Sequence, residues 1–217
     1  MAYVGQVLDN PVSGERFIFT KTAADTAGEL VAVEFVVDPG GRVPGGHVHP
    51  IQEERFEVVS GTMRFRKGRD TVLAGPGDAL TVPPATYHRF ANAGDSPAVL
   101  RVEVRPALRM EQLWETVVAL AQQGRTFRSG LPRPVDLALF MREFEQEVQP
   151  PLAPGLVRAA TAPLAWLATR RGLSRRYQAS PIQYPARAPK PAATRPGQGR
   201  ASAARPTPAR PSTPRKR

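Results

Sequence analysis

The chain has 217 residues, with 30 Lys+Arg against 19 Asp+Glu, a formal net charge of +11 and no cysteine. This length suffices for one domain with a core of ordinary size plus appendages, and the lack of cysteine excludes disulfides, thiolate ligands and a cysteine nucleophile. No apolar run approaches the roughly 18 residues of a membrane span and no signal-peptide pattern opens the chain, so the sequence predicts a cytoplasmic protein without a transmembrane segment.

The positive charge is concentrated toward the C-terminal end. Residues 1–149 carry a net charge of −3, whereas residues 150–217 carry +14 and contain no acidic residue. From Ala186 onward there is no aromatic and no bulky aliphatic residue, so this segment cannot bury enough surface to fold. We therefore predict a mostly disordered basic tail over residues 173–217, which binds polyanions weakly and without specificity.

The first hundred residues predict an all-β core, because short strand-like segments are separated by Gly, Pro, Asn and Asp. In residues 31–37 the odd positions are bulky and apolar, and in residues 100–105 the even positions are. Many short strands with closely spaced turns are typical of an antiparallel β-barrel or jelly roll, which we place at residues 1–106. Strands are expected at residues 6–8, 16–20, 30–37, 48–50, 56–59, 62–66, 71–74, 79–82, 88–92 and 98–105.

After Pro106 the apolar residues recur every three or four positions, which predicts a short α-helical extension over residues 107–172. One amphipathic helix is expected from Met110 to about Gly124, and a second, introduced by Pro134, extends to Val148. A third apolar segment, residues 156–167, is interrupted by Pro163. Its Trp166 and flanking arginines are compatible with a membrane-surface helix. Packing against the barrel or against a second subunit, as in a homodimer, is the commoner outcome for such a stripe.

Two of the three histidines of the chain, His49 and His88, fall in predicted strands, and His47 directly precedes the first of these strands. His47 and His49 are two residues apart, so on an extended strand both imidazoles point to one face and can converge on one ion. Glu54 follows on an otherwise apolar face, where an unpaired carboxylate would cost several kcal/mol and a metal ion would offset that cost. His88 can supply a third imidazole.

Two adjacent carboxylates compete for the acidic position. Glu54 shares a strand face with Phe56 and Val58, whereas Glu53 shares the opposite, charged face with Arg55 and Glu57. A displacement by one residue reverses the face of a strand residue. Strand alternation therefore favours Glu54 as the inward carboxylate and leaves Glu53 in solvent.

These residues resemble the two signature motifs of the cupin family, G-x5-H-x-H-x(3,4)-E-x6-G and G-x5-P-x-G-x2-H-x3-N. The matching positions are Gly41, His47, His49, Glu54 and Gly61 in the first motif, and Gly77, Pro83, His88 and Asn92 in the second. Ala85 stands where the second motif has its inner glycine, which costs about 1 kcal/mol if that turn needs a positive φ. Because there is one H-x-H and one distal histidine, the resemblance is to single-barrel cupins, or monocupins.

The resemblance implies that His47, His49, Glu54 and His88 bind one divalent transition metal, such as Fe, Mn, Ni, Cu or Zn. It also implies either dioxygen activation beside a chelated substrate or Lewis-acid polarisation of a carbonyl or enediol. Our first hypothesis is a metal-dependent dioxygenase or related oxidoreductase, or an isomerase, acting on a small organic substrate. The alternative is a noncatalytic metal-binding or small-molecule-binding module. No catalytic residue beyond the ligands can be assigned from the sequence.

An apolar substrate pocket is expected inside the barrel, beside the metal ligands. Its candidate lining residues are Phe56, Met63, Phe65 and Phe90, all on predicted inward faces. The structural alternative, that these residues only fill the barrel core, is equally compatible with the pattern.

Overall fold

The computed structural model describes residues 2–173, and all of these belong to one compact unit. The predicted basic tail, apart from Leu173, lies outside the described residues. The described chain contains β1 (Val7–Asn10), β2 (Glu15–Lys21), β3 (Val31–Val37), β4 (Glu53–Ser60), β5 (Met63–Lys67), β6 (Asp70–Ala74), β7 (Ala79–Val82), β8 (His88–Asn92), β9 (Ala98–Arg105), α1 (Met110–Gln122), α2 (Pro134–Glu143) and α3 (Pro154–Arg170).

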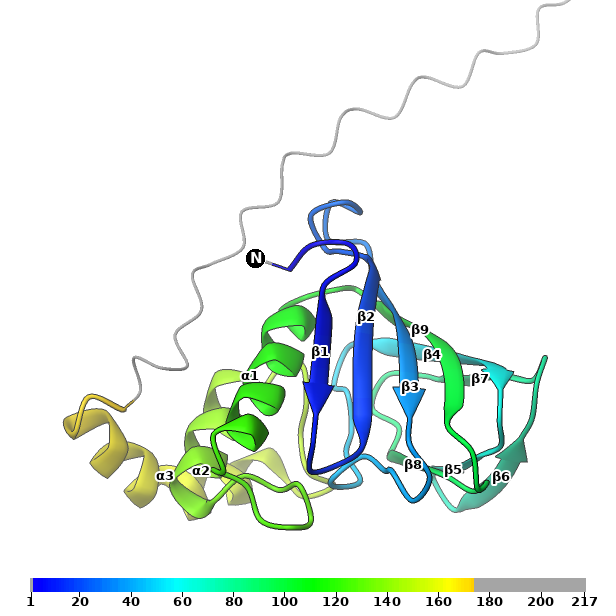
Figure 1. The fold of residues 1–217 in the computed structure, drawn as a ribbon. Coiled ribbons are helices and arrows are strands. Elements are labelled where there is room, and N and C mark those ends of the chain that lie inside the picture. Colours follow the sequence, from blue (N-terminus) through cyan, green and yellow to red (C-terminus); the bar gives the residue numbers. More distant parts are fainter. Residues whose placement is uncertain (1, 174–217) are drawn as a thin grey trace, which may run out of the picture. The chain divides into compact units, whose positions relative to one another are not determined.

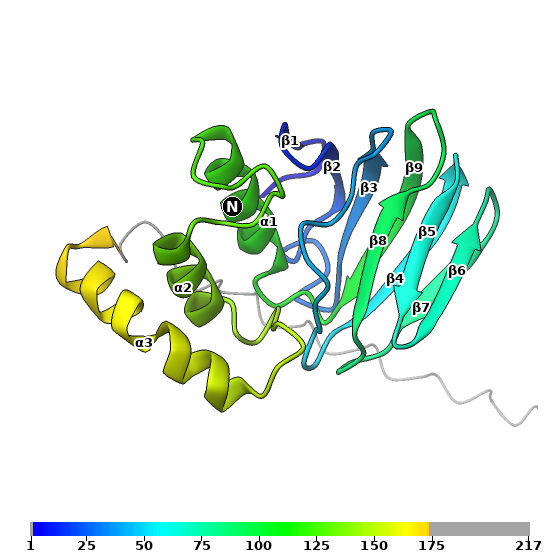
Figure 2. The same ribbon diagram turned by 90° about the horizontal axis from the view of Figure 1, so that it is seen from below.

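The strands form two antiparallel sheets that enclose the core. The larger sheet has the order β1-β2-β3-β9-β4-β7 and the smaller β6-β5-β8 (Figure 1). Figure 2 shows the two sheets facing each other, with β8 and β5 opposite β3, β9 and β4. Burial alternates along β9, where Leu100 and Val102 are buried and Arg101 is exposed. This arrangement confirms the predicted all-β jelly-roll core.

The predicted strand at residues 48–50 does not form. The segment makes isolated bridges instead, between His47 and His88 and between Val48 and Gln149. Prolines at positions 44 and 50 lack the N–H that a continuous ladder needs. At Gly46 an added Cβ would meet the side chain of Tyr87, so glycine lets the loop pass close to that ring. The two histidines of the H-x-H pair are therefore presented by a loop and not by a strand.

Both predicted helices form, as α1 and α2, and both contribute to the core of the barrel. The second is shorter than predicted, because α2 ends at Glu143 and residues 144–147, before Val148, form a turn. Leu113 and Trp114 of α1 and Phe140 of α2 belong to the same cluster of buried residues as the strands. The indole of Trp114 stacks on the ring of Phe17 in β2 at a centroid distance of 5.3 Å. The boundary predicted at residue 106 therefore marks the change from strands to helices. It does not divide the core, because both parts share one hydrophobic cluster.

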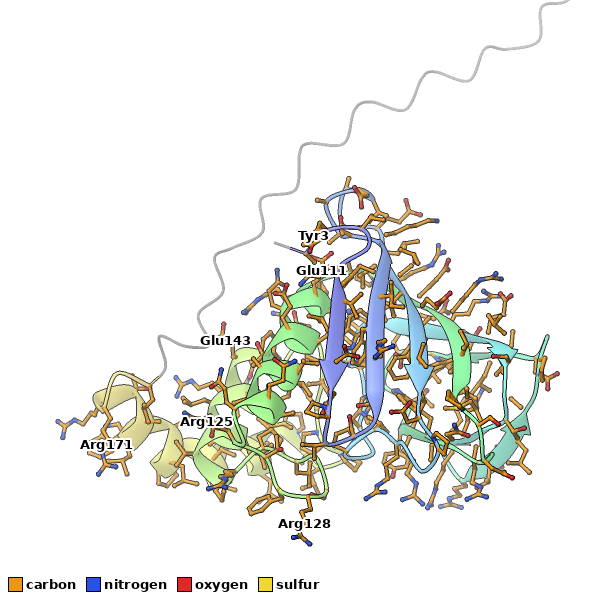
Figure 3. The ribbon with its side chains drawn as sticks, in the orientation of Figure 1. Tyr3, Glu111, Arg125, Arg128, Glu143 and Arg171 are labelled. Carbon is orange, nitrogen blue, oxygen red and sulfur yellow. The ribbon has the colours of Figure 1, made fainter. Side chains whose placement is uncertain are left out.

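Ion pairs tie the helical segments together. Arg109, before α1, donates a hydrogen bond of 2.6 Å to the carboxylate of Glu143 at the end of α2. Arg125, after α1, donates bonds of 3.0 and 2.6 Å to the two carboxylate oxygens of Asp136 in α2. Figure 3 shows Arg125 and Glu143 on this helical side of the molecule. Bidentate pairing of this kind fixes orientation as well as distance.

The third apolar segment is one continuous helix, α3, in spite of Pro163. The proline removes one backbone donor, but Ala165 and Ala168, beyond it, are buried against Ala138 and Leu139 of α2, and this packing offsets the loss. Trp166 remains 57% exposed. No helix among the described residues is long and apolar enough to span a bilayer.

Ala85 adopts the positive φ that its position in the second motif requires, with φ at 58°. Its N–H donates to the carbonyl of His49 at 2.8 Å, so this turn supports the histidine loop.

We expect Ala85→Gly to stabilise the protein by about 0.5–1 kcal/mol. The left-handed conformation costs a residue with a Cβ about 1–2 kcal/mol, and the larger backbone entropy that glycine loses on folding cancels part of this gain. Urea denaturation measures this gain. Ala24→Gly, at an exposed turn without positive φ, is the control and should give none.

Candidate metal centre

Four potential metal ligands converge near one end of the barrel. His47 and His49 come from the loop before β4, Glu54 from β4 and His88 from the start of β8. Each offers one ligand atom, and these atoms all lie within 4.8 Å of one another. His49, Glu54 and His88 are buried, and His47 is half-buried. The structure thus brings together the whole predicted ligand set, although His47 and His88 are 41 residues apart in the sequence.

The inward carboxylate is Glu54, in agreement with strand alternation. Its side chain is directed to the same interior as Phe56 and Val58, which are both buried. The Oε2 atom of Glu54 lies 2.8 Å from Nε2 of His88. Glu53 is exposed and pairs in register with Arg105 of β9. Only Glu54 can therefore contact the histidine cluster.

Backbone carbonyls orient all three imidazoles. The Nδ1 atom of His47 lies 3.0 Å from the carbonyl oxygen of Gly45, that of His49 lies 2.5 Å from the oxygen of Glu147, and that of His88 lies 3.2 Å from the oxygen of Thr86. A carbonyl accepts only, so this partner assigns a proton to Nδ1 of each ring and directs Nε2 toward the cluster, where it can bind an ion once it carries no proton. Imidazoles that bind metals are usually held in this way.

The cluster is electrostatically prepared for a cation. Burial, together with the neighbouring His49 and His88, lowers the pKa of His47 to about 3. Burial alone would lower the pKa of His49, but the Glu54 carboxylate outweighs it and raises that pKa above 6.5. Burial opposes ionisation of Glu54, yet His49 and His88 hold its pKa below the ordinary 4.5. The site therefore keeps an ionised carboxylate in a buried position.

Nε2 of His49 is buried and makes no hydrogen bond, and its contact is the Oε2 atom of Glu54, 3.3 Å away. An ion placed between these atoms would bind the imidazole nitrogen and the carboxylate oxygen together. Three imidazole nitrogens and one carboxylate oxygen form a donor set that suits divalent transition metals. The residues present therefore fit a metal ion.

The helical extension supports the centre directly. The segment after α2 provides the Glu147 carbonyl that accepts from His49, and Gln149 forms the bridge with Val48. The Glu147 carboxylate in turn accepts the backbone N–H of Arg109 at 3.1 Å. Sequence reasoning missed this support because a carbonyl acceptor is a backbone group and carries no residue-type signal.

A cavity of about 650 Å³ opens beside the cluster. His47, His49 and Glu54 line it on the barrel side, and residues of α1, α2 and α3 line it on the opposite side. Of the four predicted pocket residues, Phe56 and Phe90 line this cavity. Met63 and Phe65 are buried in the core and are not among its lining residues, because they project between the two sheets, away from the helices. The helical wall was not predicted.

Glu15 is a second buried acid on the cavity wall that sequence reasoning did not identify. Its side chain is 5% exposed, and its Oε2 accepts a hydrogen bond of 2.5 Å from the Ser13 hydroxyl. Burial raises the pKa of Glu15 to about 8, against the lowering effect of Ser13 and with a smaller raising contribution from Glu54. The signal available in the sequence was an acidic residue in the inward phase of β2, where Phe17 and Phe19 alternate with it.

Two facing antiparallel sheets with three histidines and one glutamate near one end define a β-barrel protein with a candidate site for a single metal ion. Residues 33–104 match the family model described as Cupin domain. This part of the chain is therefore a cupin domain, and the described residues form one barrel.

Comparison with curated proteins finds no match, whereas many solved structures are similar. A protein of Thermus thermophilus is 26% identical, with 37% of this chain and 75% of that chain covered and a TM-score of 0.35. KdgF from a Halomonas species is 17% identical, with 51% and 99% covered and a TM-score of 0.44. A predicted oxalate decarboxylase of Thermotoga maritima is 16% identical, with 48% and 92% covered and a TM-score of 0.43.

Proposed function

We propose that the protein is a mononuclear metal enzyme, an oxidoreductase of the dioxygenase type, that acts on a small organic substrate. The observation that carries this proposal is the contact between the donor cluster and the cavity: His47, His49 and Glu54 line its wall. A purely structural metal site is enclosed by its ligands and needs no cavity beside it. A cavity of this size is within the range of small-molecule sites.

The four side chains His47, His49, Glu54 and His88 would hold the ion, one of Fe, Mn, Ni, Cu or Zn. When bound, such an ion supplies Lewis acidity and, if it is redox-active, electron transfer with dioxygen. The protein residues contribute orientation and charge. Backbone carbonyls fix the ring planes of the histidines, and Glu54 supplies one negative charge against the two of the ion.

The cavity walls control what reaches the centre. Phe56, Phe90 and Val102 line its barrel side and are buried, so they exclude water from the space next to the ligands. Exclusion of water strengthens electrostatic interactions and prevents side reactions. The substrate is thereby held against the open side of the donor cluster.

An isomerase, the other enzyme candidate, and a noncatalytic binding module, the alternative to an enzyme, are distinguished by one observation. Among the described lining residues other than the metal ligands, only Glu15 and Thr161 carry a carboxyl or hydroxyl group. Proton transfer during isomerisation needs a positioned acid or base, and Glu15 is the one such side chain on the wall. A module that only binds would need neither.

Metal analysis tests the proposal. Protein purified without an affinity tag is expected to bind one transition-metal ion per chain, and saturating metal, at about 100 times its Kd, should raise Tm by roughly 5–10 °C. Affinity should fall as the pH decreases, because a proton on Nε2 of a histidine competes with the ion. For His49 this competition begins above pH 6.5, since its pKa is raised. Thermal unfolding with each metal at pH 6 and pH 8, against protein treated with chelator, measures both effects.

Oxygen consumption separates the oxidoreductase from the noncatalytic binding module. Loaded protein that consumes dioxygen with a small organic substrate supports the oxidoreductase. Loaded protein that binds such molecules without turnover supports the binding module. A chain that binds none of the five metals contradicts the metal enzyme and leaves only small-molecule binding.

A further inference from the structure

The route from solvent to the donor cluster is apolar along its length. Leu131, Leu152 and Leu156 line the cavity and are 38%, 58% and 61% exposed, so they form its rim. Large apolar side chains gathered at the edge of a cavity are typical of surfaces that contact a ligand. Deeper in the cavity, Phe17 and Trp114 continue this apolar surface.

No cationic side chain lines the cavity among the described residues. Its ionisable groups outside the histidines are the carboxyls of Glu15 and Glu54. A carboxylate, phosphate or sulfate held away from the donor cluster would lose its hydration without gaining a basic partner, which costs several kcal/mol. An anionic group on the part of the substrate that contacts the apolar wall is therefore disfavoured.

Polar contacts are confined to one side of the cavity. The hydroxyl of Thr161 already donates to the carbonyl of Val157 at 2.8 Å, so the helical side offers little to a polar ligand. The donor cluster and Glu15 both belong to the barrel side. A ligand that matches this distribution has its polar atoms at one end.

We propose that the site takes a largely apolar small molecule whose body carries no charge, with an oxygen function, a hydroxyl or a carbonyl, at the end that reaches the donor cluster. This substrate class rests on the proposed function and makes it more specific. The apolar body of the molecule lies against α1, α2 and α3, and its oxygen lies beside His47, His49 and Glu54.

A matched pair of fluorescent probes tests the inference. N-phenyl-1-naphthylamine is neutral, and 8-anilino-1-naphthalenesulfonate has the same ring skeleton with a sulfonate added. The neutral probe should bind at least about 10-fold more tightly, because the sulfonate finds no counter-charge. In metal-free protein, 1-octanol should displace the neutral probe, and octanoate should do so at least about 10-fold less well for the same reason.

Two substitutions on α3 locate the bound probe. Ala160 is exposed and lines the cavity, whereas Ala162, also exposed, does not line it. Ala160→Trp should lower the affinity for N-phenyl-1-naphthylamine by about 10-fold or more by filling the space. Ala162→Trp should leave it unchanged. Metal content and Tm of both variants should equal those of the wild type.

The outcomes separate this inference from the proposed function, because the probes are titrated into metal-free and metal-loaded protein alike. Equal affinity for the two probes, or binding that ignores Ala160→Trp, overturns the substrate class while bound metal still supports the enzyme. Selective probe binding by a chain that holds no metal supports the apolar cavity and overturns the metal enzyme.

Discussion

Glu54→Gln is expected to weaken metal binding by about 10-fold or more, and Glu53→Gln to leave it unchanged. The first substitution keeps the shape of the side chain but removes the only carboxylate of the cluster, whose Oε2 lies 2.8 Å from Nε2 of His88. Loss of a partner that only orients a ligand already costs about 10–100-fold in affinity, and loss of a ligand charge should cost no less. The second substitution removes a charge that faces solvent.

Isothermal titration of metal-free protein with Zn²⁺ measures both affinities. Glu53→Gln is a matched control because it makes the same chemical change one position away in the same strand. If Glu53→Gln lost more metal affinity than Glu54→Gln, or the same amount, this would contradict both the ligand assignment and the placement of Glu54 on the inward face of β4.

Glu15→Gln is expected to remove a large pH dependence of stability. The pKa of Glu15 rises from 4.5 in the unfolded chain to about 8 in the folded protein, so the folded state binds the proton more tightly. This contribution to stability is fully present below about pH 4.5 and is lost as the pH rises through about 8. Each unit of pKa difference corresponds to about 1.4 kcal/mol, so the loss amounts to a few kcal/mol.

Glutamine cannot ionise and can still accept the hydrogen bond from Ser13. The variant should therefore match the wild type near pH 4.5 and exceed it by a few kcal/mol at pH 8. Urea denaturation of metal-free protein across this range provides the comparison, with Glu34→Gln on the exposed face of β3 as the control. Parallel stability curves for Glu15→Gln and wild type would show that Glu15 is ionised in the folded protein.

The sequence predicted features that depend on local alternation. The bounds of β7, β8 and β9 agree with the expected residues, because apolar and polar positions alternate between turn residues. The same alternation identified Glu54, and not Glu53, as the inward carboxylate. These predictions needed only the period of a strand and the position of the turns.

Features that depend on contacts between distant parts of the chain could not be predicted. The H-x-H segment is held by single bridges from His47 to His88 and from Val48 to Gln149 in place of a strand ladder. The continuation of α3 through Pro163 depends on its packing against α2. The cavity forms only where three helices meet the barrel, so no local pattern describes its shape.

The support that Glu147 gives to His49 has a consequence for how freely the sequence can vary. The acceptor is the main-chain oxygen of residue 147, which almost any amino acid would provide. The ligands occupy residues 47–88, and the helical wall comes from residues 110–161. The residues that would bind the metal and the residues of the helical wall therefore lie in successive stretches of the chain. A different helical wall could be joined to the same ligand set, provided that the backbone path through residue 147 is kept.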